Sequence, residues 1–314
     1  MSFTSVATQN RTTLTGRYQD PDGTRKYIFK TERGVLEIAH IRNRKDREVF
    51  CVPSMYSCRL GCTFCHLTTK KIQPVSGKVH IEELEDAMSL IERNQDVPLL
   101  VSVMGVGDGS QNIDLIRGLR EKDYYVSVAS IVPTLSFIDK LEEIGGVKLH
   151  FSLHNSIEEE RKQIMPATRG CPSLEKTIER VSSYASRVSP PKPFVTGDGR
   201  EIEIYSRGYM AEVHYTLIED VNDSPVHVSS LSDILLRSGL PIKFLQFKPS
   251  LDYVPSASAG KVATFLKDSG VKVKEYNPPG QEIQTSCGQF TPWFYENRPE
   301  YAEERKEYER KFAF

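Results

Sequence analysis

Three cysteines stand close together in the chain at a spacing that suits metal binding. Cys58, Cys62 and Cys65 form a C-x3-C-x2-C motif with the sequence CRLGCTFC. Thiolates are the usual protein ligands of iron–sulfur clusters. Three thiolates on one short loop can hold three irons of a four-iron cubane, so the fourth iron has no protein ligand. The motif therefore predicts a 4Fe-4S cluster with one iron open to a bound substrate.

An open iron can chelate the amino and carboxylate groups of S-adenosylmethionine (SAM). One electron from the cluster then breaks the sulfonium bond and gives a 5′-deoxyadenosyl radical, which is chemistry carried by the cofactor. Structural zinc is the alternative, but it needs four ligands. His66 could be the fourth, yet it directly follows Cys65 and would strain the geometry. The aromatic Phe64 also favours the radical SAM interpretation over a non-catalytic iron–sulfur or zinc module.

Composition limits the classes of protein to consider. The chain has 314 residues, 39% of them hydrophobic and 26% charged, and a formal net charge of −1. A near-neutral chain has no basic field for non-specific nucleic-acid binding, so RNA would need a local basic patch. No apolar run approaches the roughly 20 residues of a membrane span. The polar start lacks a signal-peptide pattern, so we expect a cytoplasmic protein with reduced thiols.

The segments after the cysteine motif alternate between strand and helix patterns. Helical faces lie between the strands, as in Leu174, Ile178, Val181 and Ala185. Such alternation predicts a mostly parallel sheet with outer helices, here an α/β partial (β/α)6 barrel whose site lies at the C-terminal strand ends. The six expected strands are 98–105, 124–132, 147–153, 209–218, 242–248 and 271–276.

The rest of the chain is expected to flank this barrel. Apolar runs on both sides of Glu32-Arg33-Gly34 predict a β-hairpin over 26–41. A short strand at 48–52 leads into the cysteine loop. We therefore predict three parts, namely an N-terminal tail and β-hairpin extension at 1–50, a barrel at 51–290 with an inserted hairpin at 189–208, and a C-terminal helix or tail at 291–314.

Several short motifs in one order extend the cysteine motif into a family resemblance. They are CVPSM at 51–55, MGVGD at 104–108, FSLH at 151–154, DVND at 220–223 and SCGQ at 286–289. In order and approximate spacing they resemble the RlmN/Cfr family of radical SAM RNA adenine methyltransferases. The resemblance covers about 20–290.

The resemblance implies a site and two cofactors, a 4Fe-4S cluster and SAM, with two SAM consumed per turnover. The cluster is expected on Cys58, Cys62 and Cys65. SAM is expected to contact residues at the ends of three strands, namely Gly107, Asp108, Ser152, Leu153, His154 and Asn222. Asn222 could instead cap the following helix, because Asn favours that position.

The resemblance also implies a mechanism. One SAM methylates Cys287 by nucleophilic displacement, and the radical from a second SAM removes a hydrogen from that methyl group. The carbon radical adds to adenine, and Glu37 is a candidate for proton transfer. Cys51 then attacks the sulfur of Cys287 and releases the methylated base. Whether carbon two or carbon eight of adenine is methylated stays open.

Two features of the chain depart from the family pattern. Asp108-Gly109 stands where the family has Glu-Pro, and the family's N-terminal RNA-binding accessory domain has no counterpart here. A related reaction on a non-RNA substrate such as a nucleotide is therefore the alternative. If the substrate is rRNA or tRNA, basic residues near the hairpins are candidate contacts, and the inserted hairpin could replace the accessory domain. The candidates are Arg42, Arg44, Lys45, Arg47, Lys70, Lys71, Arg187, Lys192, Arg200 and Arg207. We also expect a one-electron reductant such as flavodoxin and a monomeric protein.

Overall fold

A ten-stranded sheet forms the centre of the molecule. The computed structural model describes residues 11–69, 77–205, 209–250 and 252–280. The strands follow the order β1-β2-β3-β4-β5-β6-β7-β10-β11-β12, antiparallel from β1 to β4 and parallel from β4 to β12. Their bounds are β1 Thr12–Gln19, β2 Arg25–Thr31, β3 Gly34–Ile41, β4 Glu48–Val52, β5 Leu99–Val103, β6 Tyr125–Ser130, β7 Val147–Ser152, β10 Ala211–Tyr215, β11 Ile242–Leu245 and β12 Val273–Tyr276.

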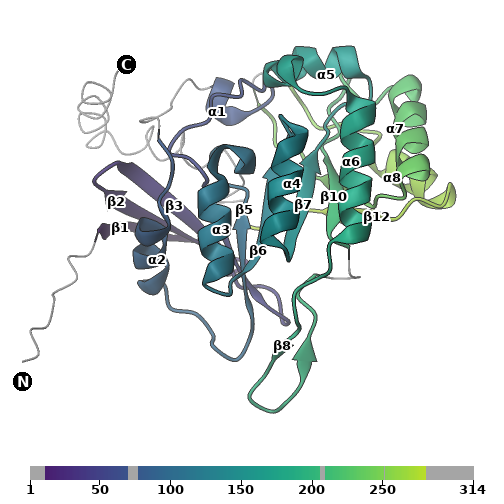
Figure 1. The fold of residues 1–314 in the computed structure, drawn as a ribbon. Coiled ribbons are helices and arrows are strands. Elements are labelled where there is room, and N and C mark those ends of the chain that lie inside the picture. Colours follow the sequence, from purple (N-terminus) through teal and green to yellow (C-terminus); the bar gives the residue numbers. More distant parts are fainter. Residues whose placement is uncertain (1–10, 70–76, 206–208, 251, 281–314) are drawn as a thin grey trace, which may run out of the picture.

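Helices cover the outer face of this sheet (Figure 1). Their bounds are α1 His66–Thr69, α2 Ile81–Ser89, α3 Ile113–Glu121, α4 Leu135–Ile144, α5 Glu158–Ile164, α6 Leu174–Arg187, α7 Pro225–Ser238 and α8 Ala259–Asp268, with 3-10 turns η1 Gly109–Asn112 and η2 Pro166–Gly170. Apolar side chains of the strands and of the inner helix faces form one continuous core. Gly145 and Gly239 end α4 and α7 with positive φ angles of 70° and 66°, as glycine allows.

The predicted fold class is confirmed. The six predicted strands correspond to β5, β6, β7, β10, β11 and β12, and the predicted hairpin to β2 and β3. Two features differ in detail from the prediction. The short strand before the cysteine loop, β4, is itself parallel to β5 and so belongs to the barrel sheet. The polar start of the chain forms the edge strand β1, which its composition did not predict.

The parallel part of the sheet curls around a single cavity of about 330 Å³. Residues from β4 at one end of the parallel strands and from β12 at the other both line it, including Cys51 and Tyr276. A flat sheet could not bring its first and last strands to one cavity, so the sheet is a partial barrel. We call this space the barrel cavity.

The insertion between α6 and β10 contains a two-stranded hairpin, β8 Phe194–Val195 and β9 Glu201–Ile202. Figure 1 shows it projecting from the end of the molecule opposite α1, the helix that follows the cysteine loop. The predicted division into three parts stays a prediction, and its C-terminal part lies outside the described residues. Among the described residues, none of the helices has the length and apolar character of a membrane span.

Candidate functional site

The three motif cysteines lie on the loop between β4 and α1, at the C-terminal end of β4. All three are half-buried. Gly61 permits the sharp turn with a φ of 69°. Two hydrogen bonds hold the loop, one from Cys65 N to Cys62 O at 3.1 Å and one from Thr63 N to Ile164 O at 2.9 Å. The loop is therefore anchored to the 158–170 region as well as to its own strand.

The donor set suits an iron–sulfur cluster. Burial raises the pKa of the Cys58 thiol and of the Cys62 thiol. Charges on Cys65 and Cys58 raise the pKa of Cys62 further, because thiolates placed close together repel one another. Three soft donors crowded in this way need a positive centre among them to ionise together. Iron supplies that charge, so the residues fit the predicted cluster.

Gly107 supports the cysteine loop through its backbone. Its N–H donates a hydrogen bond to Cys58, which favours the ionised thiol. Gly107 has a φ of 93°, and an added Cβ would lie 2.5 Å from Ser54 Oγ and 2.7 Å from Met55 Cγ. Only glycine fits this close approach. The structure thus places Gly107 against the loop that carries the cluster ligands.

Asp108 is buried, and protein donors occupy its carboxylate. Oδ1 accepts hydrogen bonds from Ser110 N at 2.9 Å, from Ser110 Oγ at 2.5 Å and from Ser130 Oγ at 2.7 Å. Oδ2 accepts one from Ile131 N at 2.8 Å. A carboxylate has about four acceptor positions. Asp108 therefore ties the end of β5 to the end of β6.

The Ser-Leu-His motif ends β7 beneath the cysteine loop. Ser152 is half-buried, and Leu153 is buried in the core. His154 has an unusual φ of 54°, and its ring lies 5.4 Å from the ring of Phe64 on the loop. Burial lowers the pKa of His154 to about 3, so the imidazole is neutral. His154 thus supports the loop by packing.

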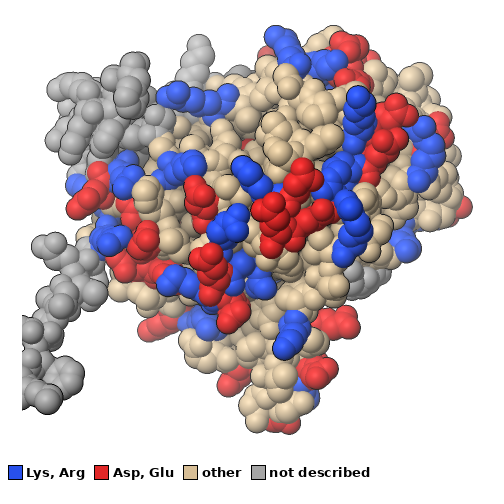
Figure 2. Space-filling view, in the orientation of Figure 1, with Lys and Arg blue, Asp and Glu red and all other residues tan. Residues whose placement is uncertain are grey.

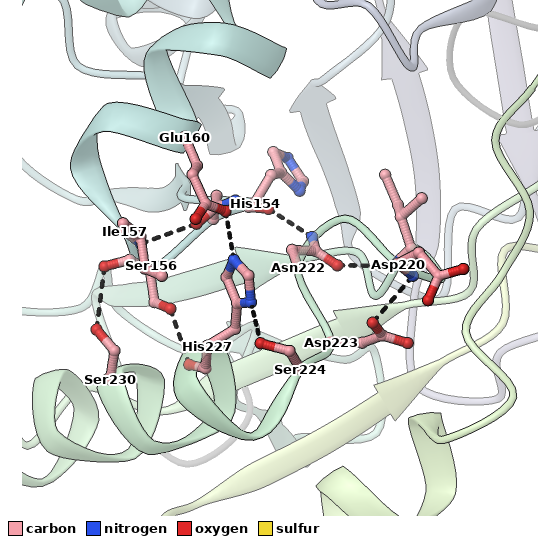
Figure 3. Close-up of polar contacts among 12 residues, drawn as sticks. His154, Ser156, Ile157, Glu160, Asp220, Asn222, Asp223, Ser224, His227 and Ser230 are labelled. Carbon is pink, nitrogen blue, oxygen red and sulfur yellow. Dashed lines mark hydrogen bonds and ion pairs between the residues drawn. The ribbon is translucent and has the colours of Figure 1, made fainter.

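Asn222 holds three backbone groups together (Figure 3). Its Nδ2 donates to His154 O at 2.6 Å and to Thr216 O at 2.7 Å, while its Oδ1 accepts from Ile218 N at 2.7 Å. The side chain is 1% exposed. Asn222 does not cap α7, whose N-cap is Ser224. It joins the ends of β7 and β10 instead.

A polar network beside Asn222 joins the next two helices (Figure 3). His227 Nε2 lies 2.5 Å from Glu160 Oε2 of α5, and His227 Nδ1 lies 2.7 Å from Ser224 Oγ at the start of α7. Ser156 Oγ donates to His227 O at 2.8 Å. The residues that follow β7 and β10 are therefore fixed to each other by side chains as well as by Asn222.

The predicted catalytic residues fall in three different places. Cys51 lies near the end of β4 and lines the barrel cavity together with Cys65. Glu37 lies on β3, 6% exposed, with Oε2 3.5 Å from Lys26 Nζ. It is not among the described residues that line the cavity. Cys287 lies outside the described residues.

A group of charged and histidine side chains was missed by the sequence interpretation. Lys148 and His150 on β7, Glu212 and His214 on β10, and Lys243 on β11 all line the barrel cavity. Each is less than 9% exposed. The sequence did carry a signal, because these residues alternate with apolar ones along each strand. Side chains of a strand point alternately to its two faces. Since helices cover the outer face, the apolar residues face the helices and the polar residues face inward.

Many of the predicted RNA-contacting basic residues have acidic partners. Arg42 Nε lies 3.2 Å from Glu48, and Arg200 Nε lies 2.8 Å from Asp198. Arg187 lies 3.0 Å from Glu142. Figure 2 shows Lys and Arg interspersed with Asp and Glu over the outer helices. On that face, the described residues form no extended basic surface. Lys70, Lys71 and Arg207 lie outside the described residues.

Comparison with known proteins relates the chain to one group of enzymes. It is 28% identical over 295 residues to "Dual-specificity RNA methyltransferase RlmN" of Marinobacter nauticus, which spans 85% of this chain and 72% of that protein. It is 27% identical over 304 residues to the RlmN of Halalkalibacterium halodurans, across 89% of this chain and 76% of that one. No family model matches the chain.

The fold agrees with this relationship. A radical SAM methyltransferase from Sphaerobacter thermophilus superposes with a TM-score of 0.72 at 22% identity, over 89% of this chain and 81% of that one. Its likeness concerns the fold, which is the partial barrel described above. The chain is thus similar in sequence to the RlmN methyltransferases over most of its length, and similar in fold to a radical SAM methyltransferase.

Proposed function

We propose that this protein is a radical SAM methyltransferase that methylates an adenine ring carbon in RNA through an S-methylcysteine intermediate. One observation carries the proposal. The cluster loop and Cys51 open onto the same cavity at the C-terminal end of β4, where Cys51, Phe64, Cys65 and His66 all line it. A thiol beside a cluster loop is what the methyl-cysteine chemistry of the RlmN relatives requires, since a cysteine must release the product.

Each residue has a stated role in this proposal. Cys58, Cys62 and Cys65 hold the 4Fe-4S cluster, which with SAM supplies the 5′-deoxyadenosyl radical when both are bound. Gly107 supports the cysteine loop through its N–H. The remaining candidates for the SAM site are Asp108, Ser152, Leu153, His154 and Asn222, and they shape it chiefly through the backbone that their side chains fix.

The two cysteines outside the motif act on the methyl group and the product. The Cys287 thiolate takes the methyl group from SAM as a nucleophile. After the methylene group has bonded to adenine, the Cys51 thiolate attacks the sulfur of Cys287. A disulfide forms, and the bond from that sulfur to the methylene carbon breaks, so the carbon leaves with the electron pair and becomes the new methyl group after protonation. Glu37 stays a candidate for the proton transfer.

The proposal includes the partners that the chemistry needs. The substrate is an rRNA or a tRNA, in keeping with the RNA methyltransferases to which the chain is related. A one-electron reductant such as flavodoxin supplies the electron for each radical. The protein works in the cytoplasm as a monomer.

Nucleoside analysis of treated RNA tests the proposal. Protein with a reconstituted cluster is incubated without oxygen with SAM, dithionite and unmodified rRNA and tRNA transcripts, and the digested RNA is examined by mass spectrometry. We expect a ring-methylated adenosine together with 5′-deoxyadenosine. Cys58→Ala gives neither product. Cys171→Ala is the matched control, because Cys171 packs below the loop without being a predicted ligand, and it keeps both. The proposal would be contradicted if 5′-deoxyadenosine forms but none of the RNAs contains a ring-methylated adenosine.

A further inference from the structure

The barrel cavity carries an excess of positive charge that the methylation chemistry does not use. Among the described residues that line it, Glu212 is the one carboxylate. The basic residues that line it are Arg44, Arg47, Lys148, Lys243, Lys248 and Lys274. Such an imbalance in a concave space attracts anions.

The charge of Glu212 is already compensated within the protein. Oε2 lies 3.0 Å from Lys148 Nζ, while Oε1 lies 2.9 Å from His150 Nδ1 and 3.3 Å from His214 Nε2. Burial lowers the pKa of both histidines, so these rings are neutral and act as hydrogen-bond partners. Glu212 thus compensates Lys148 at 3.0 Å and has Lys243 at the longer distance of 3.8 Å, so Lys243 is only weakly compensated by the carboxylate that the two lysines share. Arg47 is paired with Asp46.

Lys243 is the clearest cation of this kind. It is 8% exposed, and its Nζ lies 3.8 Å from Glu212 Oε1, which is beyond hydrogen-bond distance. The ammonium lies 4.3 Å from the centre of the Tyr276 ring, and the Arg44 guanidinium lies 5.9 Å from the same centre. Lys274 is the Cα partner of Lys243 on the adjacent strand. Two cations therefore lie against the Tyr276 ring, and Lys274 stands beside Lys243 on the adjacent strand.

The pKa of Lys243 agrees with this geometry. Burial, together with the charges of Lys274, Lys148 and Arg44, lowers the pKa of Lys243 to about 8 against the opposing effect of Glu212. A buried ammonium in such a position is stabilised by an anion that the protein itself does not supply.

A divalent metal is the competing occupant. One ligand atom each from His150, Glu212 and His214 lies within 4.8 Å of the others, an arrangement of two histidines and one carboxylate that transition metals use. However, the ammonium groups of Lys148 and Lys243 lie 3.0 Å and 3.8 Å from the same carboxylate. A metal there would be repelled by both lysines, and its double charge doubles that repulsion. The charges favour an anion.

We propose that the barrel cavity binds a phosphate-bearing ligand, with the phosphate against Lys243, Lys274 and Arg44. The rest of the ligand would lie against apolar side chains of the cavity, such as Leu100 and Ile204. The volume of about 330 Å³ is at the lower end of the usual range for small-molecule sites. A row of Cα partners leads from Cys51 through Ser102 and Ser127 to Lys148, so the ligand and the proposed reacting thiol share one cavity. The site lies in the cavity that the proposed function also uses, and its test measures binding rather than methylation.

Calorimetric titration of the full-length, cluster-loaded protein with inorganic phosphate and with AMP tests the site at low salt. We expect one site per chain for each probe. Lys243→Gln and Lys274→Gln should each raise the Kd at least tenfold, and Glu212→Gln should lower it. Lys274 is exposed, so its variant does not endanger folding. Lys267→Gln is the matched control, since Lys267 is exposed and paired with Glu275 away from the cavity, and it leaves the Kd unchanged.

The outcomes decide between occupants without reference to methylation. Equal Kd values for the wild type and both cavity-lysine variants would overturn the proposal. So would stoichiometric Zn²⁺ binding that His150→Ala abolishes, in a protein that binds neither phosphate nor AMP. A short RNA that displaces phosphate would identify the phosphate as part of the RNA backbone. An RNA that binds alongside phosphate would identify a separate small phosphorylated molecule, and either result supports the anion site.

Discussion

Asp108 and Asn222 show how a buried polar side chain can join the ends of neighbouring strands. Each is almost fully buried, and the polar atoms of each side chain form hydrogen bonds with backbone or side-chain groups at the strand ends. The structure places both residues just after barrel strands, and their contact with SAM stays a prediction. The sequence could not predict the hydrogen-bond partners of Asp108. Ser110 is close to it in the chain, but Ser130 and Ile131 lie at the end of the next strand, β6, 22 and 23 residues away.

Asn222→Ala should destabilise the protein markedly. The change leaves His154 O, Thr216 O and Ile218 N without their side-chain partner in a buried place. Each buried group left unsatisfied costs roughly 1–3 kcal/mol. We therefore expect the free energy of unfolding to fall by about 3 kcal/mol or more, measured by urea unfolding. Asn94→Ala is the control, because Asn94 is exposed and its side chain accepts only the local hydrogen bond from Asp96 N, and it should change little. Equal stability of the two variants would show that Asn222 has no such structural role.

Gly107→Ala should weaken retention of the cluster. The added Cβ would collide with Ser54 and Met55, and the backbone shift that relieves the collision moves the N–H away from Cys58. We expect lower iron and sulfide content per chain after anaerobic reconstitution. Gly197→Ala is the control, because an added Cβ there meets nothing within 4 Å. Full iron content in Gly107→Ala would contradict the supporting role of this residue.

At the scale of elements, the sequence predicted the barrel strands from their apolar runs. These runs exist because the strands pack against the outer helices, where their apolar side chains form the core. The edge strand β1 was missed because most of its residues are exposed, and its pattern is therefore polar. The charged cavity was missed for a different reason. Residues such as Lys148 and Glu212 are ordinarily placed in solvent, so their alternation with apolar residues did not predict an inward-facing set, although they line the cavity of the partial barrel.

Arg161 joins three of the elements around the cysteine loop. It lies on α5, 4% exposed, and donates to Leu153 O at 2.9 Å, to Ser152 O at 3.0 Å and to Ile131 O at 3.4 Å. The first two carbonyls belong to the end of β7 and the third to the end of β6. The planar guanidinium reaches all three from fixed directions.

Arg161→Lys should therefore lower stability although the charge is kept. An ammonium cannot bond all three carbonyls from the same position, and a lost charge-assisted hydrogen bond costs about 1.5–3 kcal/mol. We expect a loss of about 2–3 kcal/mol in the free energy of unfolding. Arg237→Lys on exposed α7 is the control and should be neutral. A neutral Arg161→Lys would show that charge alone is what this position needs.

At the scale of the whole molecule, charge is balanced outside and unbalanced inside. Among the described residues, several basic side chains on the outer helices have acidic neighbours, as in the pairs of Arg180 with Glu142 and of Lys122 with Glu85, each at 2.8 Å. The barrel cavity has the opposite character. The near-neutral net charge of −1 thus conceals a concentrated basic interior that composition could not reveal.

Buried neutral histidines should make the protein sensitive to acid. Burial lowers the pKa of His40 to about 4, of His150 to about 4 and of His154 to about 3, from the ordinary value of 6.5. Below pH 6.5 the unfolded chain takes up protons at these positions that the folded chain does not. Stability is therefore present above pH 6.5 and is lost as the pH falls towards 4, by about 1.4 kcal/mol per pH unit for each histidine.

His40→Gln isolates one of these contributions. Urea unfolding at pH 7.5, 6.5 and 5.0 should show a slope with pH that is smaller than that of the wild type by about 1.4 kcal/mol per unit in the acid range. An unchanged slope would mean that His40 accepts its proton in the folded state at its ordinary pKa.

The central claim is that this barrel methylates through a cysteine, and the mass of the peptide that contains Cys287 tests it most directly. The protein is purified without oxygen, incubated with SAM and digested. The account predicts that the peptide is heavier by one methylene group, and that Cys51→Ala with RNA present leaves a covalent RNA fragment on the same cysteine. An unmodified Cys287 in protein that still cleaves SAM reductively would contradict the account.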